Sequence, residues 1–222
     1  MYVLDNELTS QAVESYEKNG FVHIQELISS DLVNFLLNTF KLAIETTKVD
    51  SEENILRIKE EPPELGDKHS IVSDVETKPS LGSYGNILSD SLLHLLTPFV
   101  STIAARPLYP TYSYIRRYSK YQKLKTHLDR PENMHTMSID IDICNSNDIW
   151  PLYIESNNKV EEINLKPTDI VLFKGQELKH WRNTLENKDE SFHVYLAWSE
   201  KQMHLFDYRK FLSFPHVNSL QS

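Results

Sequence analysis

The stretch THLDRPENMH, residues 126–135, places a histidine and a carboxylate, His127 and Asp129, on alternate residues. Alternate side chains of a β-strand point to the same face. If this stretch is a strand, the imidazole of His127 and the carboxylate of Asp129 converge on one point. Imidazole nitrogens and carboxylate oxygens are common ligands of divalent metals. The pair therefore predicts part of a metal site, whose next ligand has to come from elsewhere in the chain.

We expect that ligand to be His180, which lies in KPTDIVLFKGQELKHWRN, residues 166–183. A strand over 170–173 runs into a turn at Gly175, and the following strand brings up His180. Two imidazoles and one carboxylate on one face of a metal are the arrangement of non-heme iron(II) oxygenases, which leaves three positions for co-substrate and oxygen. The sequence thus predicts His127, Asp129 and His180 as the ligands of one metal ion.

Other histidines compete for the third position. His135 is too close to His127 in the sequence to come from an opposing strand, and His193 lies in FHVYLAW, which is typical of a core strand. His204 is a further rival, whereas His94 lies in the apolar pattern of a helix and is expected only to pack there.

Several stretches resemble the iron(II)/2-oxoglutarate-dependent dioxygenases, in particular phytanoyl-CoA-dioxygenase-like and prolyl-hydroxylase-like members. The sequence YEKNGFVHIQELISSDLVNFL, residues 16–36, is similar to their N-terminal segment, and YIRRY with KTHLD is similar to their first core strand and His-x-Asp motif. The pattern P-x-D-x-V-x-F-x-G-x-x-x-x-H, residues 167–180, resembles their approach to the distal histidine. The resemblance covers most of the chain and implies a double-stranded β-helix, a jelly-roll or cupin-like core flanked by N-terminal helices.

The resemblance also implies three cofactors or co-substrates, Fe(II), 2-oxoglutarate and O2. The far carboxylate of 2-oxoglutarate needs a cation, which family members place a short way after the distal histidine. This chain has no cation there, because those positions are Asp189, Glu190 and Ser191. Arg182 is the best substitute, since on a strand it shares the inward face with His180 and its guanidinium suits a carboxylate. Further candidates for co-substrate binding are Tyr118, which matches an aromatic of prolyl-hydroxylase-like members, and the cations Lys188, Arg116, Arg117 and Arg209.

The elements expected around these residues change in type near Pro107. Helices are expected within 8–19, ending at Gly20, within 30–47 and within 89–104, and strands over 111–118, 125–129, 136–143, 150–155, 169–173, 178–183 and 192–199. Ser138, Asp140 and Asp142 alternate with isoleucines, which is typical of a half-buried strand. We therefore expect a mostly β protein with flanking helices (α+β) and one domain over 1–222. Within it, 1–106 form a helical part and 107–222 the β core. The polar stretch 48–83 is expected to be a loop, either mobile or covering the mouth of the barrel.

Composition limits the partners and the location. The 222 residues carry a formal net charge of −9 with no long basic run, which argues against nucleic acid as a partner. No apolar run is long enough to span a bilayer, and the N-terminus lacks a signal-peptide pattern. Cys144 is the only cysteine, which excludes an intramolecular disulfide and fits a reducing compartment. We expect a cytoplasmic protein without a membrane partner.

The function predicted from these features is a 2-oxoglutarate-dependent oxygenase that hydroxylates a C–H bond of a small molecule or amino-acid-like substrate, with a peptide also possible. Related halogenases replace the carboxylate ligand with a small residue, so the presence of Asp129 favours hydroxylation or desaturation over halogenation. Two alternatives stay open: a non-catalytic cupin-like ligand-binding barrel, and a metal-dependent cupin enzyme that does not use 2-oxoglutarate.

Overall fold

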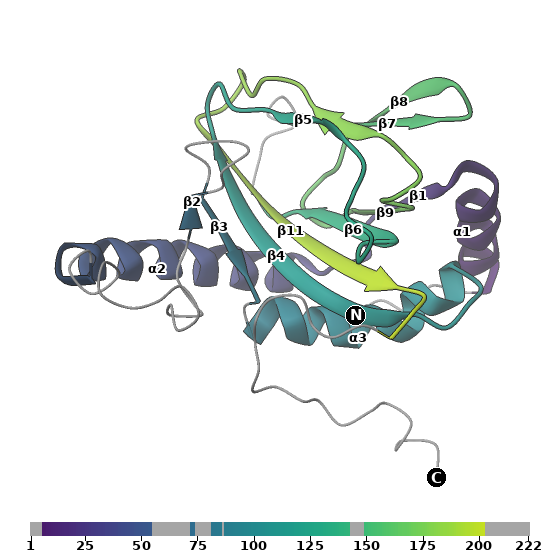
Figure 1. Ribbon diagram of the computed structural model, residues 1–222, viewed down its shortest axis with the longest axis horizontal. Helices are drawn as coiled ribbons and strands as arrows, with labels where there is room; N and C mark the ends of the chain where they lie inside the picture. The colour runs from purple at the N-terminus through teal and green to yellow at the C-terminus, as the bar shows by residue number, and fades with distance from the viewer. Residues whose placement is uncertain (1–5, 55–71, 74–80, 86, 143–148, 203–222) are drawn as a thin grey trace, which may run out of the picture.

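The computed structural model describes residues 6–54, 72–73, 81–85, 87–142 and 149–202. Its core consists of two antiparallel sheets that face each other (Figure 1). The large sheet has the strand order β1-β9-β6-β11-β4-β3-β2, and the small sheet has the order β5-β10-β7-β8. The bounds are β1 Phe21–Ile24, β2 Val72–Ser73, β3 Leu81–Tyr84, β4 Tyr109–Ser119, β5 Leu124–His127, β6 His135–Asp140, β7 Leu152–Ser156, β8 Lys159–Ile163, β9 Ile170–Phe173, β10 His180–Arg182 and β11 Glu190–Ser199. The mostly β architecture predicted from the sequence is confirmed.

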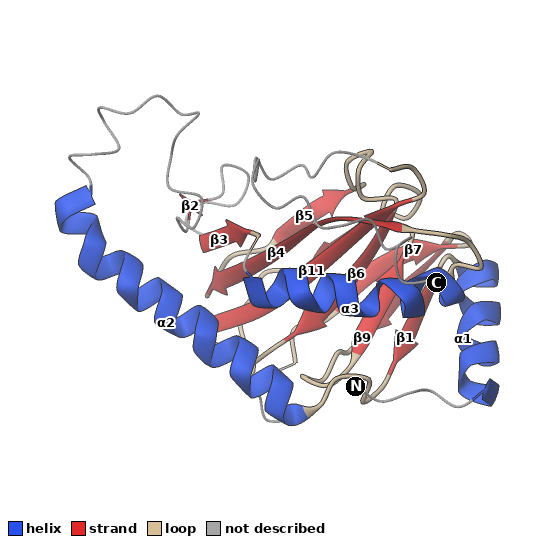
Figure 2. Cartoon of the chain, turned by 90° about the horizontal axis from the view of Figure 1, so that it is seen from below, coloured by secondary structure: helices blue, strands red, loops and turns tan. Residues whose placement is uncertain are grey.

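The described residues form three helices, α1 Asn6–Asn19, α2 Ser30–Asn54 and α3 Ile87–Ile103. Helices α2 and α3 lie along the outer side of the large sheet, and α1 contacts its edge strand β1. Figure 2, which views the molecule from below, shows α2 and α3 in front of the strands. The capping residues follow the sequence signals. Ser29 Oγ accepts a hydrogen bond from the N–H of Leu32 at the start of α2, and Gly20, with φ +75°, ends α1 in the left-handed conformation that glycine adopts without strain.

The main apolar cluster lies between the helices and the large sheet, and smaller clusters lie toward the small sheet. The main cluster includes Phe40 of α2, Leu96 of α3, Ile139 of β6 and Leu196 of β11, all almost fully buried. Met137 and Ile139 of β6, and Ile141 just after it, point into this main cluster, so the alternate side chains point toward the small sheet. The space between the two sheets is consequently lined by polar as well as apolar residues.

That polar lining corrects the prediction for β6. Ser138, Asp140 and Asp142 were expected on a water-facing side of a half-buried strand, yet they are 0%, 3% and 7% exposed. The alternation of polar and apolar residues was read correctly, but the polar face meets the small sheet instead of solvent.

The prediction that residues 48–83 form a loop is also wrong in part. Helix α2 continues to Asn54, and β3 pairs with β4 in the register Leu81 to Arg117 through Tyr84 to Tyr114. Residues 55–71 and 74–80, on which the prediction of a lid depends, lie outside the described residues. Strand β8 was missed; it follows a turn in which Asn157 and Asn158 both have positive φ, a hairpin signal that the sequence Asn-Asn carries.

No helix in the described ranges is long and apolar enough to cross a membrane.

Candidate metal centre

His127 and His180 lie on neighbouring strands of the small sheet. They are directly paired in the register of β5 and β10, and their ring centroids are 4.2 Å apart. Asp129 follows the end of β5, where its backbone N–H donates to the carbonyl of Gly175 at 2.8 Å. The candidate ligand atoms of His127, Asp129 and His180 all lie within 4.8 Å of one another. The structure therefore brings together the three residues that the sequence singled out.

A β-bulge in β5 turns His127 toward the site. Three residues of β10, His180 to Arg182, lie opposite four residues of β5, Leu124 to His127. The extra residue allows Leu124 and His127 to share the inward face although they are three positions apart. Leu124 packs against the buried cluster of Tyr118, Trp150 and Leu185, while His127 meets His180. The simple alternation assumed for 127 and 129 does not apply, because the strand ends at His127 and Asp129 is placed by the following turn.

Both imidazoles are oriented by the same backbone hydrogen bond. His127 Nδ1 lies 2.8 Å from the carbonyl oxygen of Lys125, and His180 Nδ1 lies 3.0 Å from that of Leu178. A carbonyl only accepts, so each Nδ1 carries the proton and each Nε2 of a neutral ring is left with a lone pair. Hydrogen bonds of this kind fix the tautomer and orientation of metal-binding histidines.

The two carboxylate oxygens of Asp129 have different contacts: one bonds to Thr136 and the other faces the two histidines. Oδ2 accepts a 2.6 Å hydrogen bond from Thr136 Oγ1, and Oδ1 lies 3.5 Å from Nε2 of both His127 and His180. Burial by itself would raise the pKa of Asp129, but hydrogen bonds from the two histidines and Thr136 and the charge of His180 lower it below its usual range. The carboxylate is thus ionised at neutral pH. When a metal replaces the hydrogens at the two Nε2 atoms, the two imidazole lone pairs and the carboxylate form a set that fits a divalent cation.

Gly175 leaves room for this carboxylate. A Cβ at Gly175 would lie 2.2 Å from Asp129 Oδ2 and 2.8 Å from both Thr136 Oγ1 and the carbonyl oxygen of Asn133. These distances are shorter than van der Waals contact, so any other residue would push Asp129 away. The sequence suggested Gly175 only as a turn; its contact with Asp129 depends on the fold.

The predicted rival ligands lie elsewhere or outside the described residues. His135 contacts Tyr16 Oη at 2.6 Å and Glu200 at 3.3 Å, and His193 contacts Asp140 and Ser191. His204 lies outside the described residues. His94 is half-buried on α3, where burial lowers its pKa.

Arg182 points into the space between the sheets, as its parity with His180 predicted, and it is fully buried. Its guanidinium is already paired with Asp140: Nη2 donates to Oδ1 at 2.7 Å and Nη1 to Oδ2 at 3.2 Å. Nη1 also donates to the carbonyl of Trp150, and Nη2 lies 3.5 Å from Ser138 Oγ. Among the described residues, Arg182 Nε has no acceptor. The fork expected to hold a co-substrate carboxylate is therefore occupied by Asp140, and Nε is the donor that remains.

The other candidate groups for co-substrate binding differ in position. Tyr118 is fully buried, with its ring 4.9 Å from that of Trp150, and Arg116 stacks over it at 4.5 Å. Lys188 pairs with Asp142 at 2.5 Å, and Arg117 with Glu190 at 3.0 Å. Arg209 lies outside the described residues.

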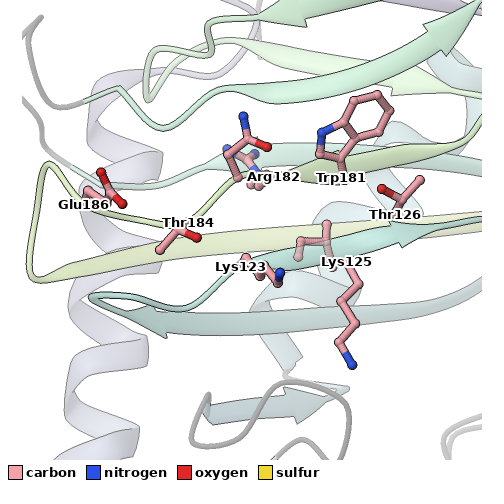
Figure 3. Close-up of a pocket in the computed structure, with 9 residues that line it drawn as sticks. Lys123, Lys125, Thr126, Trp181, Arg182, Thr184 and Glu186 are labelled. Atoms are coloured by element: carbon pink, nitrogen blue, oxygen red, sulfur yellow. The ribbon is translucent and has the colours of Figure 1, made fainter.

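A polar pocket of about 520 Å³ opens beside β5 and β10 (Figure 3). Lys123, Lys125 and Thr126 line it from the β5 side, and Trp181, Thr184 and Glu186 line it from the β10 side. None of the three candidate metal ligands lines this pocket, so we do not assign it to the metal centre.

Comparison with known proteins finds similarity in structure but not in sequence. No family model matches the chain, and no curated protein matches it significantly. A prolyl-4-hydroxylase from Pseudomonas putida aligns with 87% of this chain and 100% of its own, at 11% identity and a TM-score of 0.62. HygX from Streptomyces hygroscopicus, solved with nickel, 2-oxoglutarate and hygromycin B, covers 88% of both chains at 12% identity and a TM-score of 0.60. The α-ketoglutarate-dependent epimerase SnoN of nogalamycin biosynthesis covers 88% of this chain and 84% of its own, at 8% identity and a TM-score of 0.62.

These neighbours confirm, at the level of the fold, the resemblance noted from the sequence. The chain has the double-stranded β-helix fold of the Fe(II)/2-oxoglutarate oxygenases.

Proposed function

We propose that this protein is an Fe(II)- and 2-oxoglutarate-dependent oxygenase whose metal is held by His127, Asp129 and His180. The observation that carries the proposal is the convergence of two imidazole Nε2 atoms on Asp129 Oδ1, each at 3.5 Å, within this fold. Ligands bound cis to one another at about 2.1 Å from a metal are about 3 Å apart, so a small contraction completes the site. Oxygen and nitrogen donors with three open positions suit Fe(II).

The chain's own residues hold and orient this centre. His127 and His180 present Nε2 because the carbonyls of Lys125 and Leu178 hold the protons on Nδ1. Thr136 fixes Asp129 so that one oxygen faces the imidazoles. When bound, iron and 2-oxoglutarate supply the oxidising chemistry that acts on a substrate C–H bond. No acid or base from the protein is required for that chemistry, so the protein binds, orients and excludes side reactions.

The interior supports 2-oxoglutarate through Arg182, which stands two residues beyond His180 on β10. Two residues of strand span about 6.6 Å, comparable with the length of a five-carbon dicarboxylate. Arg182 Nε, the guanidinium donor without an acceptor in the described part of the chain, is available to the far carboxylate. We therefore keep Arg182 as the anchor, acting through Nε, with Tyr118 beside it.

For the reaction, we propose hydroxylation of a small molecule or an amino-acid-like substrate. The neighbours include a prolyl-4-hydroxylase, a structure with hygromycin B bound, and an epimerase, so related folds act on substrates of different kinds. Retention of the carboxylate Asp129 favours hydroxylation or desaturation. We expect a reducing, cytoplasmic location, because the chain has a single cysteine.

The test is anaerobic addition of Fe(II) and 2-oxoglutarate, followed by visible absorption spectroscopy. Chelation of the metal by the 2-oxo acid should give a weak charge-transfer band, and admission of oxygen should give succinate. The variant His180→Ala should show neither. Absence of the band and of succinate in the wild-type protein would favour a non-catalytic barrel, whereas oxygen consumption independent of 2-oxoglutarate would favour a cupin enzyme of another type.

A further inference from the structure

A continuous chain of hydrogen bonds crosses the interior next to the proposed co-substrate site. We call it the interior network; its members are Lys188, Asp142, Ser191, His193, Asp140 and Arg182. Asp142, Ser191, His193, Asp140 and Arg182 are at most 7% exposed. The network reaches the metal centre through two strands, because Arg182 follows His180 on β10 and Asp140 lies on the same face of β6 as Thr136.

Three contacts at the centre of the network each require one hydrogen. Asp140 Oδ1 lies 2.7 Å from His193 Nδ1, His193 Nε2 lies 2.8 Å from Ser191 Oγ, and Ser191 Oγ lies 2.8 Å from Asp142 Oδ2. The serine hydroxyl supplies one hydrogen, and a neutral imidazole supplies one more. With both carboxylates ionised, the third hydrogen has to be a second proton on His193.

Both carboxylates accept hydrogen bonds from several cationic or backbone donors. Asp140 accepts two hydrogen bonds from Arg182, and Asp142 accepts from Lys188 Nζ at 2.5 Å and from the backbone N–H of Phe192 at 2.5 Å. All three contacts can be hydrogen bonds at once only when His193 is an imidazolium; with a neutral His193, one of the three close contacts lacks a hydrogen. With the imidazolium, the charge of the network is +1, since Arg182 and Lys188 balance the two carboxylates and His193 adds one.

We infer that His193 takes up a proton when 2-oxoglutarate binds, so that the interior network becomes cationic toward the far carboxylate. This inference rests on the proposed function. It gives His193 a positioning role. His193 lies on β11, the strand after His180, and on the same strand Ser191 occupies a position where the family resemblance leads one to expect a cation. The carboxylate neutralises the added charge, and the proton completes the three hydrogen bonds.

The groups around His193 explain why the proton is weakly held before an anion binds. Burial lowers the pKa of His193, Asp140 and Asp142 raise it, and Arg182 on β10 lowers it. From β4, Arg116 is the cross-strand neighbour of His193, and Tyr118 places its ring 5.4 Å away; Tyr195 stacks from β11 and Trp150 packs from the small-sheet side. The charge of Arg182 opposes a second proton on His193 until an anion compensates it.

The experiment measures protons together with binding. Titration calorimetry of 2-oxoglutarate into the anaerobic Fe(II) protein, repeated in phosphate and in Tris, gives the number of protons taken up from the difference in heats. Above the pKa of the network we expect about one proton per 2-oxoglutarate, and a Kd that rises about tenfold per pH unit. Ring 15N shifts of labelled histidine in the Zn(II)-loaded protein should show His193 changing from neutral to imidazolium on addition of 2-oxoglutarate.

Ser191→Ala tests the proton uptake most directly. It keeps His193 but removes two of the three contacts, so a neutral imidazole then suffices and uptake should fall close to zero. His94→Gln, on α3, is the matched control and should keep the wild-type uptake. Circular dichroism and thermal melting confirm that each variant is folded; if Ser191→Ala is not, His193→Asn, which can keep the bond to Asp140, replaces it with the same expected loss.

The outcomes separate the two proposals. Binding of 2-oxoglutarate with no proton uptake, or with equal uptake in Ser191→Ala and wild type, overturns this inference and leaves the proposed function intact. Absence of both the visible band and binding heat overturns both.

Discussion

Thr136 donates a 2.6 Å hydrogen bond to Oδ2 of Asp129, which leaves Oδ1 at equal distance, 3.5 Å, from Nε2 of each candidate histidine ligand. The threonine therefore decides which oxygen of the carboxylate faces the metal position. Without this bond, the carboxylate could rotate about its terminal torsion, which has broad minima.

Thr136→Val keeps the shape of the side chain and removes the hydroxyl. We expect metal affinity to fall about 10- to 100-fold, the usual effect of losing a group that supports a metal ligand. Fe(II) or Co(II) titration measures the change. Thr111→Val is the matched control, because Thr111 is also buried but donates to the carbonyl of Ala197. Equal losses in both variants would assign the effect to general destabilisation.

Gly175→Ala should abolish stoichiometric metal binding, because its Cβ would lie 2.2 Å from Asp129 Oδ2. Metal content after loading and desalting is the measurement. The neighbouring variant Gln176→Ala should retain one metal per chain. Full occupancy in Gly175→Ala would show that Asp129 is not a required ligand.

His127→Ala and His180→Ala should each remove metal binding while the cooperative thermal transition is kept, since the main apolar cluster lies between the helices and the large sheet. His135→Gln should retain the metal, because His135 bonds to Tyr16 and Glu200. Metal analysis and thermal melting of the three variants distinguish the sets of ligands. Loss of metal in His135→Gln alone would reassign the third position.

Arg182→Ala should raise the apparent Michaelis constant for 2-oxoglutarate at least about tenfold, which corresponds to roughly 1.4 kcal/mol. Because the variant also leaves Asp140 buried without its partner, we expect it to lower the free energy of unfolding by about 3–5 kcal/mol. Kinetics and urea unfolding measure the two effects separately. In Arg117→Ala, where a half-buried ion pair with Glu190 is lost, both changes should be small. The reverse ranking of the Michaelis constants would place the anchor on β4.

The buried pair of Asp140 and Arg182 also predicts how stability depends on pH. Burial would raise the pKa of Asp140, but the charge of Arg182 and the hydrogen bonds from Arg182 and His193 lower it below its usual range. Its contribution is therefore present above the unfolded pKa of about 3.9 and is lost as the pH falls toward the folded value. Urea unfolding between pH 6 and pH 3 should show a steeper loss of stability, by up to about 1.4 kcal/mol per pH unit, in wild type than in Asp140→Asn. Parallel curves for the two proteins would contradict the assignment.

The sequence predicted the three converging residues because their types and order are those that metal chemistry requires. It could not reveal Thr136 or Gly175 as their supports, since both act through contacts made only when β6 and the turn before β10 come together. The polar row on β6 was misread for a related reason. A period of two separates the faces of a strand but does not say whether the polar face meets water or another sheet. Asp140, His193 and Ser191 were consequently missed as a buried network.

The bulge in β5 determines which of the strand's side chains point inward. Leu124 belongs to the apolar cluster and His127 to the metal centre, and an odd separation puts both on one face only if one residue is extra. Deletion of either Lys125 or Thr126 would turn the side chains on one side of the deletion to the opposite face of β5. Either Leu124 would then leave the apolar cluster or His127 would leave the metal centre. Both intervening side chains are exposed, and the bond to His127 uses only the backbone carbonyl of Lys125. The length of this stretch is therefore constrained by the site, while the identities of its two middle residues are not.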